Sequence, residues 1–183
     1  MIIISYTVKK KIAKAFQSLV EKKDFQHVSV TEIMVVANVR RQTFYDYFED
    51  KYFLLNWFVN DSLTELIDNN LNYLLWEDII KLTFFDIYYH KRFYLKCIKS
   101  QNEVNVPVVI ANHFKVLINQ LCQTMANSKE KENFTQTFSL GLANLLVDGL
   151  TTTNSVDYEI ITGRATRAIR FIYDQFKLPQ QNN

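Results

Sequence analysis

Glycine and proline are scarce in this chain, which has three glycines and two prolines among its 183 residues. Tight hairpins and β-bulges draw on these residue types, so there are few places where strands can turn. Apolar residues recur instead at spacings of three and four, the period of an amphipathic helix. The sequence therefore predicts an all-α protein of about nine helices, long enough for one or two domains with a hydrophobic core.

The segment 29–39 has the pattern of a short helix that ends in a tight turn. Ser29 and Glu32 match a capping box, in which each side chain bonds the backbone amide of the other, so a helix is predicted to begin at Val30. Asn38 tolerates the left-handed conformation that a tight turn needs, so this helix is predicted to end at Ala37. Its apolar face is expected to carry Ile33, Val36 and Ala37.

A second short helix is predicted to begin at Arg41. Phe44 and Phe48 lie four residues apart, so both point the same way and can pack on the first helix. At about 100° per residue, Arg41, Gln42 and Tyr45 share one edge beside this apolar face. An arginine fork matches guanine O6 and N7, glutamine pairs with adenine N6 and N7, and a helix of this size fits the major groove. These three residues are predicted to read base edges.

Charge is biased toward the same end of the chain. Residues 1–55 carry nine Lys and Arg against six Asp and Glu, whereas the remainder carries twelve against thirteen, and the net charge of the whole chain is +2. This bias places a mild positive charge on the proposed DNA-binding end. The four lysines of segment 9–14 are either a solvated helix start or phosphate contacts. The residues predicted to contact DNA phosphates are Ser29, Thr31, Thr43, Tyr47 and Lys51.

This N-terminal pattern resembles the DNA-binding domain of TetR-type transcriptional regulators within residues 1–55. The matching positions are Thr31-Glu32-Ile33, Ala37, Val39, Thr43-Phe44-Tyr45, Tyr47-Phe48 and Lys51. The resemblance implies the same base-facing and phosphate-facing residues. Two positions depart from the family pattern: Asn38 replaces a glycine, and Arg40 replaces a serine cap and adds a charge. The run RRQTFYDYF with the following Leu54-Leu55 and Trp57 is similar to the TetR subgroup of dihydroxyacetone kinase operon activators.

The resemblance implies a DNA-binding helix-turn-helix domain over residues 1–50 and a helical regulatory and dimerisation body over residues 51–183. A long helix is predicted to start at Lys51 with Asp50 as its cap. Because this helix joins the two parts, a tilt of the helix would move the recognition helix.

Aromatic residues are dense from this long helix to residue 114. In TetR-type proteins the corresponding body binds an effector, so these rings are interpreted as an effector pocket. The alternative is an ordinary packed core, which bulky rings favour because they leave little cavity. The effector is either an unknown small molecule or a partner protein, and the subgroup resemblance points to the partner. The candidate pocket residues are Trp57, Trp76, Phe84, Tyr88, Phe93 and Phe114.

Residues 134–177 are predicted to form two helices after a polar linker at 127–133. Small residues on their apolar stripes allow close helix approach, and in TetR-type proteins the last two helices form a four-helix dimer interface. The resemblance therefore implies a homodimer, while the alternative is that the two helices close the monomer core. The predicted interface residues are Phe138, Gly141, Leu142, Leu145, Ile161, Ala165, Ala168 and Ile172.

Other functional classes find little support in the sequence. There is no glycine-rich phosphate loop, G-x-S-x-G or H-E-x-x-H motif, so no catalytic residue and no enzyme activity is predicted. Cys97 and Cys122 stand alone, which predicts buried reduced thiols, no metal and no cofactor. No apolar run approaches the roughly 20 residues that cross a bilayer, so a cytoplasmic protein without a membrane partner is expected. Its expected partners are double-stranded DNA, a second copy and the effector.

Overall fold

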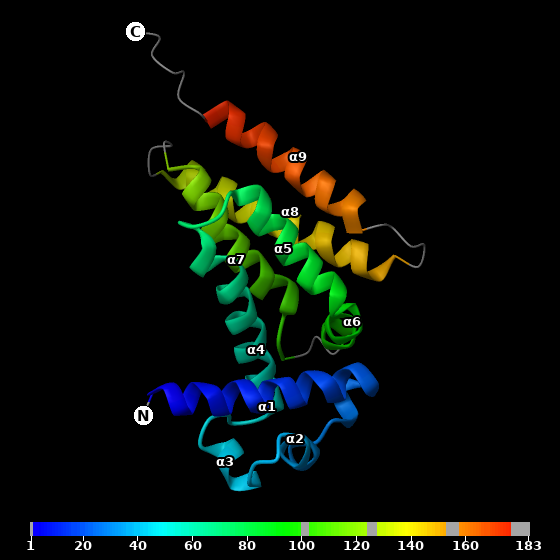
Figure 1. Ribbon diagram of the computed structural model, residues 1–183. Helices are drawn as coiled ribbons and strands as arrows, with labels where there is room; N and C mark the ends of the chain where they lie inside the picture. The colour runs from blue at the N-terminus through cyan, green and yellow to red at the C-terminus, as the bar shows by residue number, and fades with distance from the viewer. Residues whose placement is uncertain (1, 100–102, 124–127, 153–157, 177–183) are drawn as a thin grey trace. The chain divides into compact units, whose positions relative to one another are not determined.

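The computed structural model describes residues 2–99, 103–123, 128–152 and 158–176. Across these ranges the chain forms nine α-helices, two short 3-10 turns and no strand (Figure 1). The 3-10 turns are η1 (Phe25–His27) and η2 (Asp68–Asn70). The α-helices are α1 (Ile2–Lys22), α2 (Val30–Val36), α3 (Arg41–Tyr45), α4 (Lys51–Leu66), α5 (Trp76–Tyr89), α6 (Lys91–Lys99), α7 (Val106–Leu121), α8 (Lys129–Thr151) and α9 (Tyr158–Phe176).

The chain forms two compact units, each built from segments that are distant in the sequence. The first unit contains Met1–Ser62 and His90–Val106, and the second contains Leu63–Tyr89 and Pro107–Asn183. Helix α4 therefore belongs to both units. The first unit extends beyond the head predicted over residues 1–50, because the start of α4 and the whole of α6 pack with it.

Phenylalanine rings build the core of the first unit. Phe16 of α1 lies edge-on to Phe25 and Phe93, with ring centroids 6.0 and 5.7 Å away. Phe58 of α4 lies 5.0 Å from the same Phe93 of α6. All four side chains are buried. Edge-to-face pairs add to the stabilisation from apolar burial, so this cluster fixes α6 and the start of α4 on α1.

In the second unit, α9 packs against both α5 and α8. Phe84 of α5 and Phe114 of α7 are fully buried, with ring centroids 6.0 Å apart. Gly149 of α8 faces Ile161 of α9, and a Cβ atom on Gly149 would overlap Cδ1 of that isoleucine. A larger residue at this position would therefore force the Ile161 side chain to move.

Helix α8 begins earlier than the sequence predicts. Residues 127–133 are predicted to be a linker, but the helix starts at Lys129. The Ser128 hydroxyl accepts a hydrogen bond from the Lys131 amide at 3.2 Å, which is an N-cap contact. The charged residues that suggested a linker are also good helix formers, so with this cap they extend the helix. Asn127 lies outside the described residues.

Candidate nucleic-acid interface

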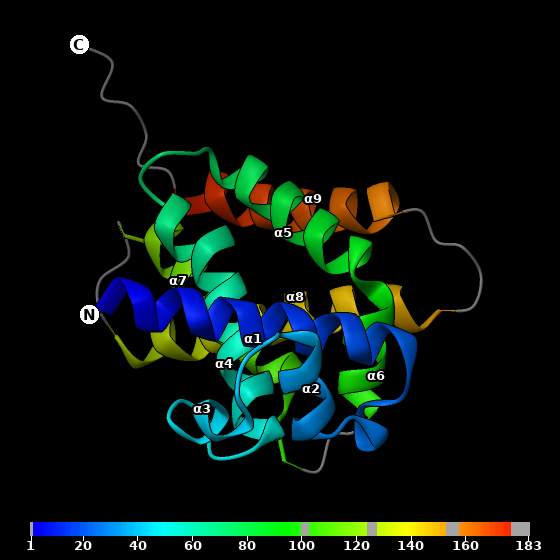
Figure 2. The same ribbon diagram turned by 60° about the horizontal axis from the view of Figure 1, so that its bottom comes forward.

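The three helices at the start of the chain pack consecutively, α1 on α2 and α2 on α3 (Figure 2). Helix α2 carries the predicted capping box: the Glu32 amide donates to Ser29 Oγ at 3.3 Å, and the Ser29 amide donates to Glu32 Oε2 at 3.0 Å. Lys23 donates a further hydrogen bond to Glu32 Oε1. These bonds, that from Lys23 first and those from Ser29 next, lower the pKa of Glu32 to about 2. The start of α2 is thereby fixed to the end of α1.

The turn after α2 uses the predicted residue. Asn38 has a φ of 49°, in the left-handed region, and among the described residues it is the one non-glycine residue with positive φ. The Val39 amide then donates to the carbonyl of Met34 at 3.1 Å, which closes the turn. Asparagine visits this conformation more readily than most residues, so it replaces the usual glycine at modest cost.

The buried face of α2 differs from the prediction at one position. Ile33 and Ala37 are buried as expected, but Val36 is 52% exposed and Met34 is only 2% exposed. Val36 and Met34 are both apolar, so the sequence allows either to accompany Ile33.

Helix α3 presents the predicted base-reading edge to solvent. Phe44 and Phe48 are buried with ring centroids 5.5 Å apart, which confirms that they anchor this segment. Arg41 and Gln42 are exposed, and Tyr45 is 54% exposed with its ring edge-on to Phe44. The structure thus brings Arg41, Gln42 and Tyr45 together at the surface of a short helix whose opposite side is fixed in the core.

Arg40 stands at the N-cap of α3 with an extended backbone, φ −62° and ψ 138°. Its side chain makes no capping hydrogen bond and is exposed. The Thr43 amide bonds the Arg40 carbonyl at 3.0 Å, so the backbone still starts the helix. The sequence predicts that Arg40 removes a side-chain cap at this position, and this prediction is confirmed.

Three aromatic rings meet an ammonium group beside α3. Lys9 Nζ of α1 lies 5.9 Å from the ring centroids of Tyr47 and Phe48 and 5.7 Å from that of Trp57. Phe48 and Trp57 themselves lie 5.6 Å apart. Cation–π attraction of this kind contributes roughly 0.5–1 kcal/mol at exposed sites. Lys9 of α1 therefore contacts both the segment that follows α3, through Tyr47 and Phe48, and α4, through Trp57. The Tyr47 and Trp57 side chains are half-buried at this point.

Lys51 makes its contacts inside the chain. Its ammonium donates to the carbonyl oxygens of Phe25, Gln26 and Val28 at 3.1, 2.9 and 3.2 Å, and it lies 4.8 Å from the centroid of the Phe25 ring. An ammonium has three N–H donors, so these bonds use its full capacity. Desolvation lowers the pKa of Lys51. This arrangement argues against the predicted phosphate contact. Through these three hydrogen bonds Lys51 instead stabilises the η1 turn, which leads into α2.

The start of α4 is capped as predicted. Asp50 Oδ1 accepts hydrogen bonds from the Tyr52 and Phe53 amides at 2.8 and 2.7 Å. The other predicted phosphate residues remain at the surface: Ser29 and Thr31 are exposed, and Thr43 is half-buried. The hydroxyl of Ser29 also donates to Glu32 Oε2 at 2.8 Å, so its primary contacts are those of the cap.

The six residues predicted to line one effector pocket are divided between the two units. Phe93 is buried in the core of the first unit, and Trp57 packs on Phe48 in the same unit. In the second unit Phe84 and Phe114 are buried against each other. Phe84, Phe93 and Phe114 thus pack as core side chains, which is the alternative interpretation of these rings, and the effector pocket stays a prediction.

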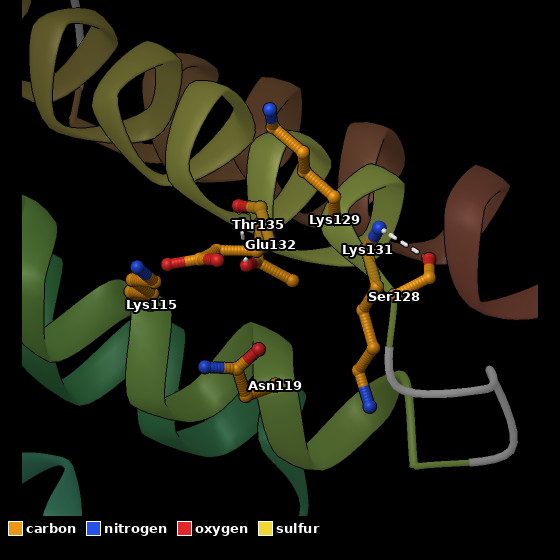
Figure 3. Close-up of a pocket in the computed structure, with 7 residues that line it drawn as sticks. All are labelled: Lys115, Asn119, Ser128, Lys129, Lys131, Glu132 and Thr135. Carbon is orange, nitrogen blue, oxygen red and sulfur yellow. Dashed lines mark hydrogen bonds between the residues drawn. The ribbon is translucent and has the colours of Figure 1, made fainter.

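The remaining two candidates, Trp76 and Tyr88, are half-buried residues of α5, and each packs against a tyrosine ring of α9. Trp76 lies 6.3 Å from Tyr173 and Tyr88 lies 5.8 Å from Tyr158, measured between ring centroids. A surface pocket of about 660 Å³ does occur in the second unit, between α7 and the start of α8 (Figure 3). None of the six predicted residues lines it. Its lining residues are Lys115, Asn119, Ser128, Lys129, Lys131, Glu132 and Thr135.

The predicted dimer residues divide between the interior and the surface. Leu142, Ile161 and Ala165 are buried within the chain itself, so they close the core of the second unit and are not available to a second copy. Gly141 and Ala168 are exposed, and a Cβ atom on Gly141 would meet nothing within 4 Å. Phe138, Leu145 and Ile172 are half-buried.

Sequence reasoning missed two exposed apolar residues on α9. Ile160 is exposed and Phe171 is 70% exposed. Phe171 lies three residues after Ala168, and Ile160 lies eight residues before it. The exposed Arg164 and Arg167 fall on the same side of the helix as Ile160 and Phe171, at spacings of four and seven from Ile160. The exposed face of α9 therefore mixes apolar and charged side chains.

Cys97 and Cys122 are buried, and burial raises the pKa of both thiols. In the part of the chain that the structure describes, no group of three His, Cys, Asp or Glu residues is placed to hold a metal ion. Among the described helices, none has both the length and the apolar character needed to cross a membrane.

Comparison with curated proteins finds two regulators of the helix-turn-helix type. The chain is 38% identical over 94 residues to the dhaKLM operon transcriptional activator DhaS of Lactococcus lactis, a match that covers 49% of this chain and 50% of that protein. It is 37% identical over 59 residues to the uncharacterized transcriptional regulator YxbF of Bacillus subtilis, covering 32% and 16%. The chain thus spans half or less of the length of these relatives. No family model matches it.

Solved structures extend the likeness over most of the chain. The dihydroxyacetone kinase operon activator DhaS superposes with a TM-score of 0.77 at 24% identity, covering 92% of this chain and 97% of that one. The TetR family repressor AlkX from a Dietzia strain, implicated in biodegradation of n-alkanes, gives a TM-score of 0.56 at 12% identity, covering 92% and 96%. The predicted all-α fold and the resemblance to TetR-type regulators and dihydroxyacetone kinase operon activators are confirmed.

Proposed function

We propose that this chain is a sequence-specific DNA-binding regulator of transcription. One observation carries the proposal: Arg41, Gln42 and Tyr45 share the exposed edge of a short helix that Phe44 anchors from behind. A capped helix and a left-handed turn at Asn38 precede it, which is the arrangement of a helix-turn-helix. Similarity to proteins named as helix-turn-helix regulators supports it.

The roles within the motif follow from chemistry and exposure. Arg41 and Gln42 carry the forks that recognise guanine and adenine, and Tyr45 adds a ring and a hydroxyl beside them. Thr31, Thr43 and Tyr47 flank this edge and supply neutral hydrogen bonds to phosphates, with Ser29 in a lesser part because its hydroxyl serves the cap. Phosphate contacts fix the register of the helix on the duplex, and base contacts select the sequence.

A homodimer is part of the same proposal. One motif of this size makes too few contacts to bind tightly alone, whereas two motifs about 34–36 Å apart read a roughly palindromic operator. The surface that suits self-association lies on α8 and α9, where small and apolar side chains reach solvent. It comprises Phe138, Gly141, Leu145, Ile160, Ala168, Phe171 and Ile172.

Control by an effector that acts on the second unit completes the proposed function, in a protein that works in the cytoplasm. A partner protein is the occupant that the packing favours, since the rings expected to form a cavity are buried against one another. A small molecule in the second unit is the alternative. An effector shifts operator affinity only through a difference in its own affinity for two conformations of the regulator.

The test is to select an operator from a random DNA pool and measure the binding of variants by fluorescence anisotropy. Arg41→Ala is expected to lose about 1–3 kcal/mol on the selected site and to relax preference at one position. Arg92→Ala is the matched control, because Arg92 is an exposed arginine on α6 of the same unit. Equal weakening of selected and random DNA by Arg41→Ala would remove Arg41 from the base-reading set.

A further inference from the structure

The helix-turn-helix segment is poor in cations. Between residues 29 and 50, Arg40 and Arg41 are the only Lys or Arg residues, and Lys51 follows directly. A protein that binds duplex DNA gains affinity by neutralising phosphates with cations and releasing counterions. The motif therefore has three candidate cations for this task, and their surroundings differ.

Two of the three cations already have other roles. Lys51 directs its three donors to the carbonyls of Phe25, Gln26 and Val28. Arg41 lies on the base-reading edge with Gln42 and Tyr45. Three neighbouring lysines of the first unit are also engaged inside the chain, Lys10 with Asp61, Lys23 with Glu32, and Lys9 with three aromatic rings, whereas Lys11 and Lys14 of α1 are exposed and lie outside the motif.

Arg40 has no comparable engagement. Its side chain is exposed and makes no cap hydrogen bond, and no ion pair to it occurs among the described residues. A side chain that can cap is preferred at this position, because its oxygen accepts a hydrogen bond from a free backbone amide of the first turn and so stabilises the helix. The chain uses such residues at Ser29 and Asp50. At the start of α3 the chain instead has Arg40, a charged residue that does not cap the helix.

We infer that Arg40 is the phosphate-binding cation of the motif and takes the role that Lys51 cannot fill. Arg40 directly precedes Arg41, the residue assigned to base reading, and both side chains are exposed. Arginine binds phosphate with two parallel N–H donors, which fixes orientation as well as affinity. This inference rests on the proposed function, since it assigns a further DNA-contacting residue.

The test is the salt dependence of DNA binding by full-length protein. For Arg40→Gln, the slope of log affinity against log salt is expected to fall by about one, on the selected operator and on random DNA alike, because each neutralised phosphate contributes about 0.9 to the slope. Sequence preference is expected to stay the same. Arg40→Lys keeps the charge and is expected to retain the slope, and Arg92→Gln on α6 is the control for loss of a surface charge.

Arg40→Ser separates this role from a structural one. Serine restores a cap, so the first unit is expected to become more resistant to urea while DNA binding still loses the same slope. An unchanged slope in Arg40→Gln, with binding otherwise normal, would overturn the inference and leave the proposed function standing. Loss of preference at a single base pair would also overturn it, since Arg40 would then be a base reader. Absence of any selected operator would count against the proposed function itself.

Discussion

Replacing Lys51 by methionine distinguishes a structural brace from a phosphate ligand. The substitution keeps an unbranched side chain, one atom shorter, and removes an ammonium that donates three hydrogen bonds to carbonyls of the η1 region. A hydrogen bond to a charged group contributes about 1.5–3 kcal/mol. The ammonium is partly exposed and water can reach the freed carbonyls, so the three do not sum. We expect the first unit to lose about 2 kcal/mol of unfolding free energy.

The assay uses the natural distribution of tryptophan. Trp57 lies in the first unit and Trp76 in the second, so a Trp76→Phe background makes fluorescence during urea unfolding report on the first unit alone. Lys22→Met is the matched control, since Lys22 is an exposed lysine in the last turn of α1.

DNA binding completes the comparison. With Lys51 as a brace, Lys51→Met lowers stability and leaves the salt slope of the folded protein unchanged. With Lys51 as a phosphate ligand, stability holds and the slope falls by about one. The second result would refute the role assigned to Lys51 and, with it, the argument that Arg40 replaces it.

Three further predictions concern the cap, the close helix contact and the dimer. The pKa of Glu32 is about 2 in the folded protein, against 4.5 for an unperturbed glutamate. Its contribution to stability is therefore present above pH 4.5 and is lost as the pH falls toward 2. Urea titrations across this range should show a smaller loss of unfolding free energy for Glu32→Gln than for the unchanged protein. Gly149→Ala should destabilise the second unit by about 1–3 kcal/mol because the added methyl overlaps Ile161. Gly141→Ala, whose methyl meets open space, should be neutral or stabilising. Both variants are measured by the same urea assay in a Trp57→Phe background. For the proposed homodimer, Ala168→Glu should give monomers in analytical ultracentrifugation and abolish tight operator binding with residues 1–50 still folded, and an unchanged dimer would exclude this face of α9.

Most of the structure of residues 1–50 could be predicted from rules that involve only neighbouring residues. The capping box at Ser29, the left-handed turn at Asn38 and the aspartate cap at Asp50 each depend on a few neighbouring residues, and the structure shows all three. The role of Lys51 was not predictable in this way. Its partners are carbonyls some 25 residues away, and backbone carbonyls leave no mark in a sequence pattern.

The second unit was only partly predictable because the pattern of one helix does not show which neighbour it packs on. On α9, Ile161 and Ala165 are buried as the stripe indicates, whereas Ala168 of the same stripe is exposed and the adjacent Ile169 is buried. A Cβ atom on Gly149 of α8 would overlap the side chain of Ile161, so this glycine gives Ile161 the space to pack on α8. A stripe read from α9 alone mixes buried and exposed positions, and Gly149→Ala should disturb the packing of Ile161.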